Sequence, residues 1–323
     1  MTTTTHDEAP DGLEGGRLPW RVGDILFYAL TAAAALATLG LVVWLAYKVV
    51  AQASGAIREF GLSFVTTVAW DPVTQEFGAL DFIFGTAATA AMALLIATPV
   101  SIAIALFLTE LAPGWIRGPV GTLVELLAAI PSVILGLWGI LVFGPWVATH
   151  LEPWLDRNLG FIPIFDGQPQ QAGLLPATLV LTLMIVPITS SICRELFSRV
   201  PRELSDGALA LGATKWETIR GVSIPYAGPG IVAAVLLGLG RAFGEAIAVT
   251  QVIGSGSGFP DSLYDSADTL ASRIASQYQG AVTGLQVDSL LYLAAILLVI
   301  SLITNVAAQT VVRRFESSRG KIA

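Results

Sequence analysis

Two ionisable residues, Arg241 and Glu245, interrupt the apolar run 229–254. A spacing of four residues places both side chains on the same side of a helix, where they can pair. The planar guanidinium suits the oxygens of an anion, and a nearby carboxylate would orient it and oppose permanent capture. Because ionisable groups inside a membrane usually face a polar path, the pair predicts a pathway for an anion. A structural ion pair that joins helices is the alternative.

Thr86 and Ser132 are further candidates for lining this pathway, because they place hydroxyl groups in two other apolar runs. Hydroxyls are also common where small residues let membrane helices approach each other. The residue type alone therefore leaves both roles open.

Other chemistry is weakly represented. The single cysteine and the two histidines have no metal-ligand spacing, and no apolar run carries a nucleophile together with a base. The phosphate-loop pattern G-x-x-x-x-G-K-[ST] does not occur, so we expect that the chain does not hydrolyse ATP itself. We expect no catalytic residue, no metal, no cofactor and no nucleic-acid partner for this chain.

A charged stretch between two apolar runs predicts a folded element where a linker would suffice. Pro201 suits the first turn of a helix, and apolar residues recur after it at helical spacing until Gly212 ends the pattern. A second short helix opens at Thr214, whose hydroxyl and the Glu217 carboxylate have the spacing of a capping box. That helix should end before Pro225. Such an element predicts a docking site, with a helix lying on the membrane surface as the alternative.

The elements that hold these residues follow from the composition. Of the 323 residues, 54% are hydrophobic and 13% are charged, whereas soluble domains are roughly 25% charged. Apolar runs of about 20 residues or more can cross a bilayer as helices, and these runs lack the alternation of barrel strands. They lie near 25–47, 83–108, 120–148, 174–193, 229–254 and 289–312. We expect an all-α polytopic membrane protein with six transmembrane helices.

Basic residues predict the orientation, because loops rich in Lys and Arg stay in the cytoplasm. Twelve of the 17 basic residues fall at the chain ends or in 109–119 and 194–220, and four fall in the other loops. Both termini are therefore expected in the cytoplasm. The loops expected outside carry eleven acidic residues. Such a field repels a free anion and suits delivery by a docked protein, although a solvated surface explains it equally simply.

The cytoplasmic loop resembles the EAA loop of ABC importer permeases, in which E-A-A-x-x-x-G is followed by nine residues and I-x-L-P. The matching positions here are Asp206, Gly207, Ala208, Gly212, Val222, Ile224 and Pro225. The spacing matches at each position, while Asp replaces Glu, Gly replaces Ala, Val replaces Ile and Ile replaces Leu. The resemblance implies coupling helices that sit in a cleft of a separate ATPase subunit and transmit its closure to the membrane helices.

Further stretches look like PstC-type phosphate permeases of that family. They are 85–89, 107–113, 130–139, 240–250 and 267–278, so that the resemblance covers most of 80–315. It implies an ABC type I importer permease fold in a bacterial cytoplasmic membrane. It also implies alternating-access transport of inorganic phosphate past Arg241 and Glu245.

The same resemblance implies several partners within the lipid bilayer and on its two sides. They are a second permease subunit of the PstA type, two ATPase subunits of the PstB type and an external phosphate-binding protein of the PstS type. ATP and Mg would be used by the partner ATPase. In this chain we expect a disordered cytoplasmic tail at 1–21 and a transmembrane permease domain at 22–323. Within that domain, 48–82 would be an external loop and 194–225 the cytoplasmic coupling loop.

Two other functions remain open at this point. A permease for another oxyanion, such as molybdate or sulfate, would carry the same coupling loop. A proton-coupled secondary transporter that uses Glu245 as a relay would work without any ATPase.

Overall fold

The computed structural model describes residues 22–319, and the tail expected at 1–21 lies outside them. The chain divides into two compact units, 1–48 and 49–323. Six helical segments among the described residues are long and apolar enough to cross a membrane. They are Gly23–Gln52, Leu80–Leu111, Ser132–Leu159, Leu174–Ser198, Lys215–Gly244 and Gly284–Ala307. The prediction of an all-α polytopic protein with six spans is confirmed, whereas the side on which the termini lie stays a prediction.

The described part of the first unit is 22–48, which belongs to the helix α1 (Val22–Gln52). Nearly all of its side chains are exposed in the isolated chain, and most of them are apolar. A helix of 31 residues that is apolar on every side suits a lipid environment.

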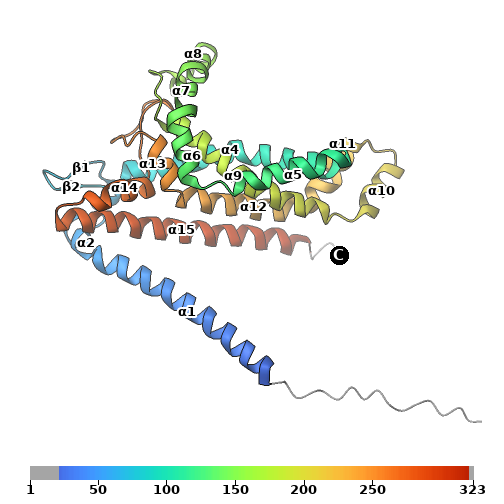
Figure 1. Cartoon of the computed structure of the whole chain (residues 1–323), viewed down its shortest axis with the longest axis horizontal. Coiled ribbons are helices and arrows are strands. Elements are labelled where there is room, and N and C mark those ends of the chain that lie inside the picture. Colours follow the sequence, from blue (N-terminus) through green and yellow to red (C-terminus); the bar gives the residue numbers. More distant parts are fainter. Residues whose placement is uncertain (1–21, 320–323) are drawn as a thin grey trace, which may run out of the picture. The chain divides into compact units, whose positions relative to one another are not determined.

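Four long helices form the bundle of the second unit (Figure 1): α4 (Leu80–Leu106), α9 (Leu174–Ser198), α12 (Ile224–Gly244) and α15 (Gly284–Arg319). α4 and α9 pack along their lengths, and α12 lies against α4, α9 and α15. Ala90, Ala93 and Ala97 of α4 are buried against Leu181 and Ile185 of α9. Such small residues let neighbouring helix backbones approach closely, which explains the long contact between α4 and α9.

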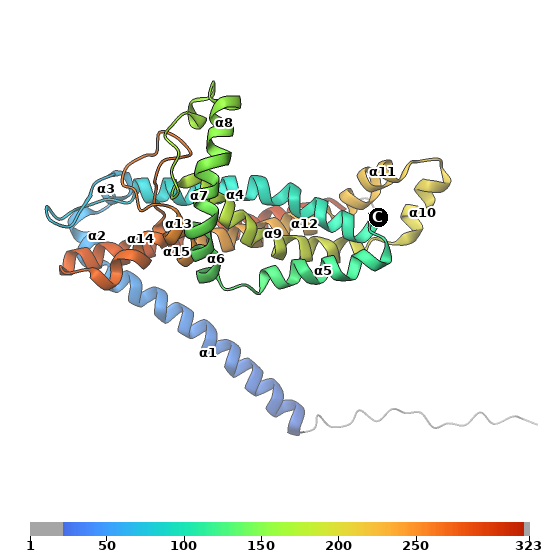
Figure 2. The ribbon, with the colours of Figure 1, turned by 45° about the horizontal axis from the view of Figure 1, so that its top comes forward.

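The bounds predicted for the third span, 120–148, are wrong. The chain forms α5 (Gly114–Ala128) against α9, turns, and starts a second helical segment at Ser132. That segment comprises α6 (Ser132–Trp138), η2 (Gly139–Phe143), α7 (Gly144–Trp146), η3 (Val147–Leu151) and α8 (Glu152–Leu159). Pro131 explains the break, because it lacks the N–H that would continue α5. Both views show the segment from α6 to α8 crossing the direction of the four-helix bundle (Figures 1 and 2).

The helix expected to stop before Pro225 continues through it. α11 (Lys215–Thr218), η5 (Ile219–Ser223) and α12 form one segment. η5 is a π-helical turn, and its wider hydrogen-bond pattern accommodates a residue that has no N–H to donate. The turns η2 and η3 are likewise followed, two residues later, by Pro145 and Pro153 within a continuing helix. Pro145, Pro153 and Pro225 therefore each follow a π-helical turn and do not end a helical segment.

We call the end of the bundle that carries α11 the inner end and the opposite end the outer end, following the predicted orientation. At the outer end lie α2 (Ser54–Phe60), α3 (Ser63–Thr66), the antiparallel strands β1 (Trp70–Asp71) and β2 (Glu76–Phe77), α14 (Leu270–Gln277) and η6 (Tyr278–Gly280). The turn η4 (Pro163–Phe165) follows α8. An aromatic cluster that includes Phe64, Phe77 and Phe82 packs beneath these elements. The segment 48–82 is thus largely structured, and its external location stays a prediction.

Candidate functional site

The run 229–254, which was expected to be one helix, is broken at Glu245. α12 ends at Gly244, and α13 (Ile247–Val252) begins after two residues. Arg241 Nη2 lies 3.5 Å from Glu245 Oε2, so the predicted pair forms. The Ala248 backbone N donates a hydrogen bond of 3.2 Å to Glu245 Oε1. The carboxylate is therefore held between the end of one helix and the start of the next.

Arg241 keeps most of its donors available. Its side chain is 43% exposed, whereas that of Glu245 is 8% exposed. A guanidinium has five N–H donors, and its ion-pair partner among the described residues is Glu245. This arrangement can hold an anion weakly, because the carboxylate beside the guanidinium offsets part of its charge.

Packing contacts place Arg241 near the middle of the bundle. A Cβ built on Gly238 would lie 2.9 Å from Ile185 Cγ2, and Ile185 lies close to the midpoint of α9. Ala242 belongs to the buried cluster between α4 and α9. Because adjacent helix residues face different directions, Arg241 points to another side of α12, where its side chain is partly exposed.

Ser132 begins the helix α6, which packs against α13. A Cβ on Gly136 would meet Ala248 Cα at 2.9 Å, and one on Gly139 would meet Val252 Cγ1 at 3.2 Å. α6 and α13 therefore run in the same direction. Ser132, the first residue of α6, thus lies one turn before the residue that meets the beginning of α13. Its side chain is half-buried.

Thr86 is not brought to this pair. It lies in the outer part of α4 and is buried. Its hydroxyl donates to the Phe82 carbonyl over 2.7 Å and accepts from the Leu270 backbone N over 2.9 Å. The hydroxyl thus joins α4 to the start of α14. Its predicted contact with a passing anion has no support from this geometry.

Sequence reasoning missed a group of charged residues at the outer end, which we call the outer clamp: Asp81, Asp268 and Arg273. All three are buried, although the sequence suggested solvated loops. Arg273 Nε lies 2.9 Å from Asp268 Oδ2, and the Arg273 Cζ lies 4.5 Å from the ring centroid of Phe82. Burial raises the pKa of Asp268, and the charge of Arg273 opposes this shift. The only sign of the outer clamp in the sequence was that Asp268 and Arg273, which have opposite charges, lie close together along the chain.

The outer clamp ties the loop 254–269 to the bundle. The Gly258 backbone N donates to Asp81 Oδ2 over 3.2 Å. Arg273 Nη2 donates to the Gly256 carbonyl over 3.1 Å. Gly258 has a φ of +90°, which glycine adopts without steric cost. The loop is consequently fixed both to α4 and to α14.

The coupling loop folds as predicted in its first part. α10 (Arg202–Ala210) follows Pro201, and Gly212, with a φ of +88°, ends it. The Thr214 hydroxyl accepts from the Glu217 backbone N, and the Glu217 carboxylate accepts from the Thr214 backbone N, so the capping box forms. The loop is therefore a rigid pair of short helices.

The apolar residues of this loop face outward. Leu211 is 91% exposed and Trp216 is 63% exposed, and Leu204 and Leu209 are also exposed. Asp206 and Gly207 of the sequence motif lie on the exposed part of α10. A cluster of large exposed apolar side chains on a structured loop is typical of a surface that binds another protein. The remaining motif residues Val222, Ile224 and Pro225 lie in the helical segment that leads from α11 into α12.

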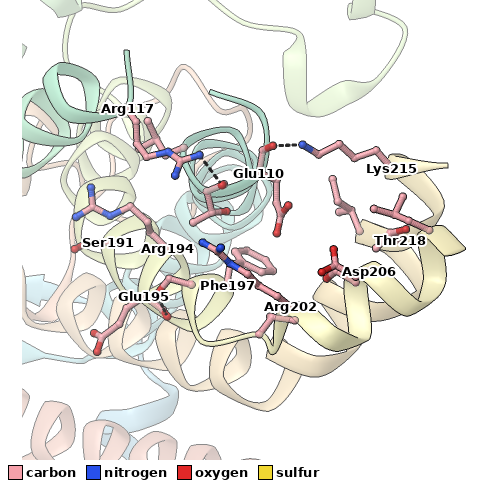
Figure 3. A pocket seen from close by; sticks show the side chains of 17 residues that line it. Glu110, Arg117, Ser191, Arg194, Glu195, Phe197, Arg202, Asp206, Lys215 and Thr218 are labelled. Carbon is pink, nitrogen blue, oxygen red and sulfur yellow. Dashed lines mark hydrogen bonds between the residues drawn. The ribbon is translucent and has the colours of Figure 1, made fainter. Parts of the chain in front are cut away.

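A cavity of about 810 Å³ lies behind α10 (Figure 3). Its wall is formed by α10 and α11 on one side, and by the end of α9, η1 (Phe107–Leu111) and the start of α5 on the other. Glu110, Arg117, Arg202, Asp206 and Lys215 surround it in Figure 3. The cavity separates the coupling helices from the inner end of the bundle.

Comparisons of the sequence with a family model and with individual relatives point to the same family. Residues 97–317 match the family described as "Binding-protein-dependent transport system inner membrane component". The chain is 42% identical over 300 residues to the phosphate transport system permease protein PstC of Haemophilus influenzae, a match that covers 92% of this chain and 95% of that protein. It is also 42% identical over 289 residues to the phosphate transport system permease protein PstC 1 of Mycobacterium tuberculosis, covering 82% of this chain and 86% of that protein.

Solved structures support the fold. A bacterial ABC transporter involved in the import of the acidic polysaccharide alginate matches 89% of this chain and 98% of its own, with a TM-score of 0.57 and 19% identity. An inward-facing MetNI methionine ABC transporter matches 76% of this chain and 99% of its own, with a TM-score of 0.50 and 19% identity. At this level of identity the likeness establishes an ABC importer permease fold and does not bear on the substrate.

Proposed function

The chain belongs to the family of binding-protein-dependent transport system inner membrane components, and from this premise we propose that it is the permease subunit of an ATP-driven importer of inorganic phosphate. The observation that carries the proposal is the 42% identity, over 92% of the chain, to a permease named for phosphate transport. The subunit would work by alternating access in a bacterial cytoplasmic membrane. ATP hydrolysis would take place in a separate subunit.

The coupling loop supports the proposed source of energy. A partner can shift a conformational equilibrium only if it contacts the two states differently. The exposed side chains of Leu211 and Trp216 offer the surface for such contacts. Because the segment Lys215–Gly244 is continuous, a displacement of α11 would be carried along one helix to Arg241. Docking at the inner end would thus act directly on the charged pair.

The position of Arg241 supports its proposed role in the pathway. Its guanidinium lies near the middle of the bundle, on a side of α12 where its side chain is 43% exposed. A second permease subunit, of the PstA type, would close the pathway from that side. Ser132, at the start of α6, would supply a hydroxyl to the phosphate oxygens. We do not include Thr86, because its hydroxyl is used between α4 and α14.

The proposed assembly also contains two PstB-type ATPase subunits, which would bind ATP and Mg, and a PstS-type phosphate-binding protein outside. The outer loops retain exposed acidic residues, such as Glu59, Asp156 and Asp261. Long-range electrostatics of this sign would disfavour entry of free phosphate and leave delivery to the docked binding protein.

Uptake of labelled phosphate tests this proposal. The four kinds of subunit are co-expressed, and uptake into vesicles is measured with internal ATP and with sulfate or molybdate as competitor. Wild-type uptake should require ATP and should resist both competitors. Arg241→Gln should lower uptake at least tenfold, since a charge-assisted hydrogen bond contributes roughly 1.5–3 kcal/mol. Arg157→Gln removes the same charge from an exposed site on α8 and should leave uptake unchanged.

Two results would contradict the proposal. Uptake driven by a proton gradient without the ATPase would identify a secondary transporter. Preferential uptake of sulfate or molybdate would keep the fold and the coupling mechanism but replace the substrate.

A further inference from the structure

The cavity behind α10 is lined by three cations, Arg117, Arg202 and Lys215, that form no ion pair among the described residues. Arg117 Nη2 donates to the carbonyl oxygens of Thr109, over 2.9 Å, and Ala112, over 3.4 Å. Lys215 donates to the carbonyl of Glu110. These acceptors are neutral. Within the described range 22–319, the ion pairs involve neither of these cations nor Arg202.

Other charges of the cavity wall are already paired. Arg194 pairs with Glu125 of α5, and Glu195 pairs with Arg199. Among the described residues, three cations of the cavity wall are thus left without an ion-pair partner. The carboxylates of Glu110 and Asp206 also line the cavity.

The floor of the cavity is formed by buried residues and is partly polar. Phe197, Thr218 and Ile219 are buried beneath it. Hydroxyl groups of Ser191 and Ser205 also line the wall. A cavity of about 810 Å³ has ample space for a small oxyanion with its waters, because one water occupies about 30 Å³ of liquid.

We propose that this cavity binds a phosphate group from the cytoplasmic side and that its occupancy slows transport. Arg117 belongs to α5, whereas Arg202 and Lys215 belong to the coupling helices. A phosphate group bridging them would tie the coupling helices to the inner end of the bundle. This inference rests on the proposed function, since the ion that accumulates inside would then be the product of transport.

The two carboxylates make the site selective. Inorganic phosphate carries at least one proton near neutral pH and can donate it to a carboxylate, whereas sulfate has no proton to donate. Glu110 and Asp206 would thus accept a hydrogen bond from phosphate and repel sulfate. The headgroup of an anionic diester lipid offers the same phosphate oxygens but no such proton. Since the charged groups are largely exposed and screened by salt, we expect a dissociation constant on the order of 1 mM.

Vesicles loaded with known concentrations of internal phosphate test the site. The complete importer is reconstituted in phosphatidylcholine, and the initial rate of ATP-driven uptake of labelled external phosphate is measured. Internal phosphate should inhibit the wild type. The double variant Arg117→Gln/Arg202→Gln should raise the half-inhibitory concentration about tenfold. Arg157→Gln, an exposed cation of α8 that does not line the cavity, should leave it unchanged.

A second variant tests the proposed selectivity. Internal sulfate should inhibit the wild type much less than phosphate does. In Glu110→Gln one of the two carboxylates is replaced by an amide that can donate to sulfate, so the preference for phosphate over sulfate should decrease. A purely structural role of Glu110 would not alter the ratio of the two inhibition constants.

The lipid source is distinguished by adding phosphatidylglycerol. Inhibition in phosphatidylcholine alone supports free phosphate as the occupant. A rate that responds to phosphatidylglycerol but not to internal phosphate, and whose response disappears in the double variant, supports the lipid headgroup. Equal inhibition of the wild type and the double variant by internal phosphate, or a rate that responds to neither internal phosphate nor phosphatidylglycerol, overturns the proposal.

Failure of the proposed function would be visible separately, as absence of uptake into vesicles without internal phosphate. The cavity is then tested by the line width of the phosphorus resonance of inorganic phosphate added to the purified complex. Broadening that the double variant removes supports the site, and equal broadening overturns it.

Discussion

The coupling loop and the outer loop differ in how they are held. The coupling loop owes its helical shape to neighbours in the sequence, such as Thr214 and Glu217 in their capping box, and a hydrogen bond from Lys215 reaches the distant Glu110 carbonyl. The outer loop 254–269 is fixed by residues distant in the sequence, since Gly258 bonds to Asp81. The first leaves large apolar side chains in the open, whereas the second buries charged side chains at its base.

This difference indicates what each loop does. A loop that holds its own shape can present a surface and be moved as a unit by a partner. A loop pinned by a buried ion pair keeps its place relative to α4, because breaking the pair leaves an uncompensated charge. We infer that a partner can displace the coupling loop, whereas the outer loop 254–269 keeps its position relative to α4.

The largest expected effect tests the outer clamp. Arg273→Ala leaves Asp268 buried without its partner. We expect a loss of about 3–5 kcal/mol in the free energy of unfolding, measured by denaturation of the purified subunit in detergent. Arg199→Ala removes one partner of the exposed pair with Glu195 and should cost no more than about 1 kcal/mol. Equal losses in the two variants would contradict the assigned difference between the loops.

The next effect concerns the coupling loop. Leu211→Ser should barely change the stability of the subunit, because the side chain is 91% exposed. It should weaken binding of the ATPase about tenfold, as expected for loss of one buried apolar contact. Val282→Ser is a matched control with the same exposure outside this loop. Pull-down of the ATPase at graded concentrations measures both, and unchanged binding in Leu211→Ser would argue against docking at this surface.

A smaller effect is expected from the cap of α11. Thr214→Ala removes the acceptor of the Glu217 backbone N and should cost about 1 kcal/mol. Hydrogen exchange should rise locally, at the amides of Lys215, Trp216 and Glu217, because the loop is held by local contacts. A rise that extends to the outer loop would show that the two loops are not independent.

The smallest effect is a dependence on pH. Burial raises the pKa of Asp268 above its usual value of 3.8, so the folded state retains the proton to higher pH than the unfolded state does. The stabilising contribution of the protonated form is complete below about pH 4 and is lost as the pH rises through the folded-state pKa. The Asp268→Asn variant does not titrate there. Relative to it, the wild type should lose stability with rising pH in urea titrations, and parallel curves would contradict this assignment.

Short-range patterns were sufficient for part of the fold and of the candidate site. The six spans were recognisable because a membrane helix needs only a long apolar run. The end of α10 at Gly212, the capping box of Thr214 and the pairing of Arg241 with Glu245 involve residues within a few positions of each other. Such features depend on the local chain alone.

Other features depended on contacts between distant parts of the chain. The break at Glu245 lies in a run that is apolar on both sides, so its composition gave no indication of a helix end. Thr86 had the residue type of a pathway hydroxyl, but its bond to Leu270 engages it at the outer end. The third span was misplaced because a proline in an apolar run is compatible with a kink, a π-helical turn or a break.

The sequence by itself therefore determined the class of protein, the number of spans and the local chemistry of the coupling loop, since run length, capping and spacing act over a few residues. Only the tertiary structure decided which charges are buried and which are open. That outcome depends on what packs against each side chain. Asp268 and Arg273 are shielded by α4 and its aromatic neighbours, whereas the side chain of Arg241 is 43% exposed.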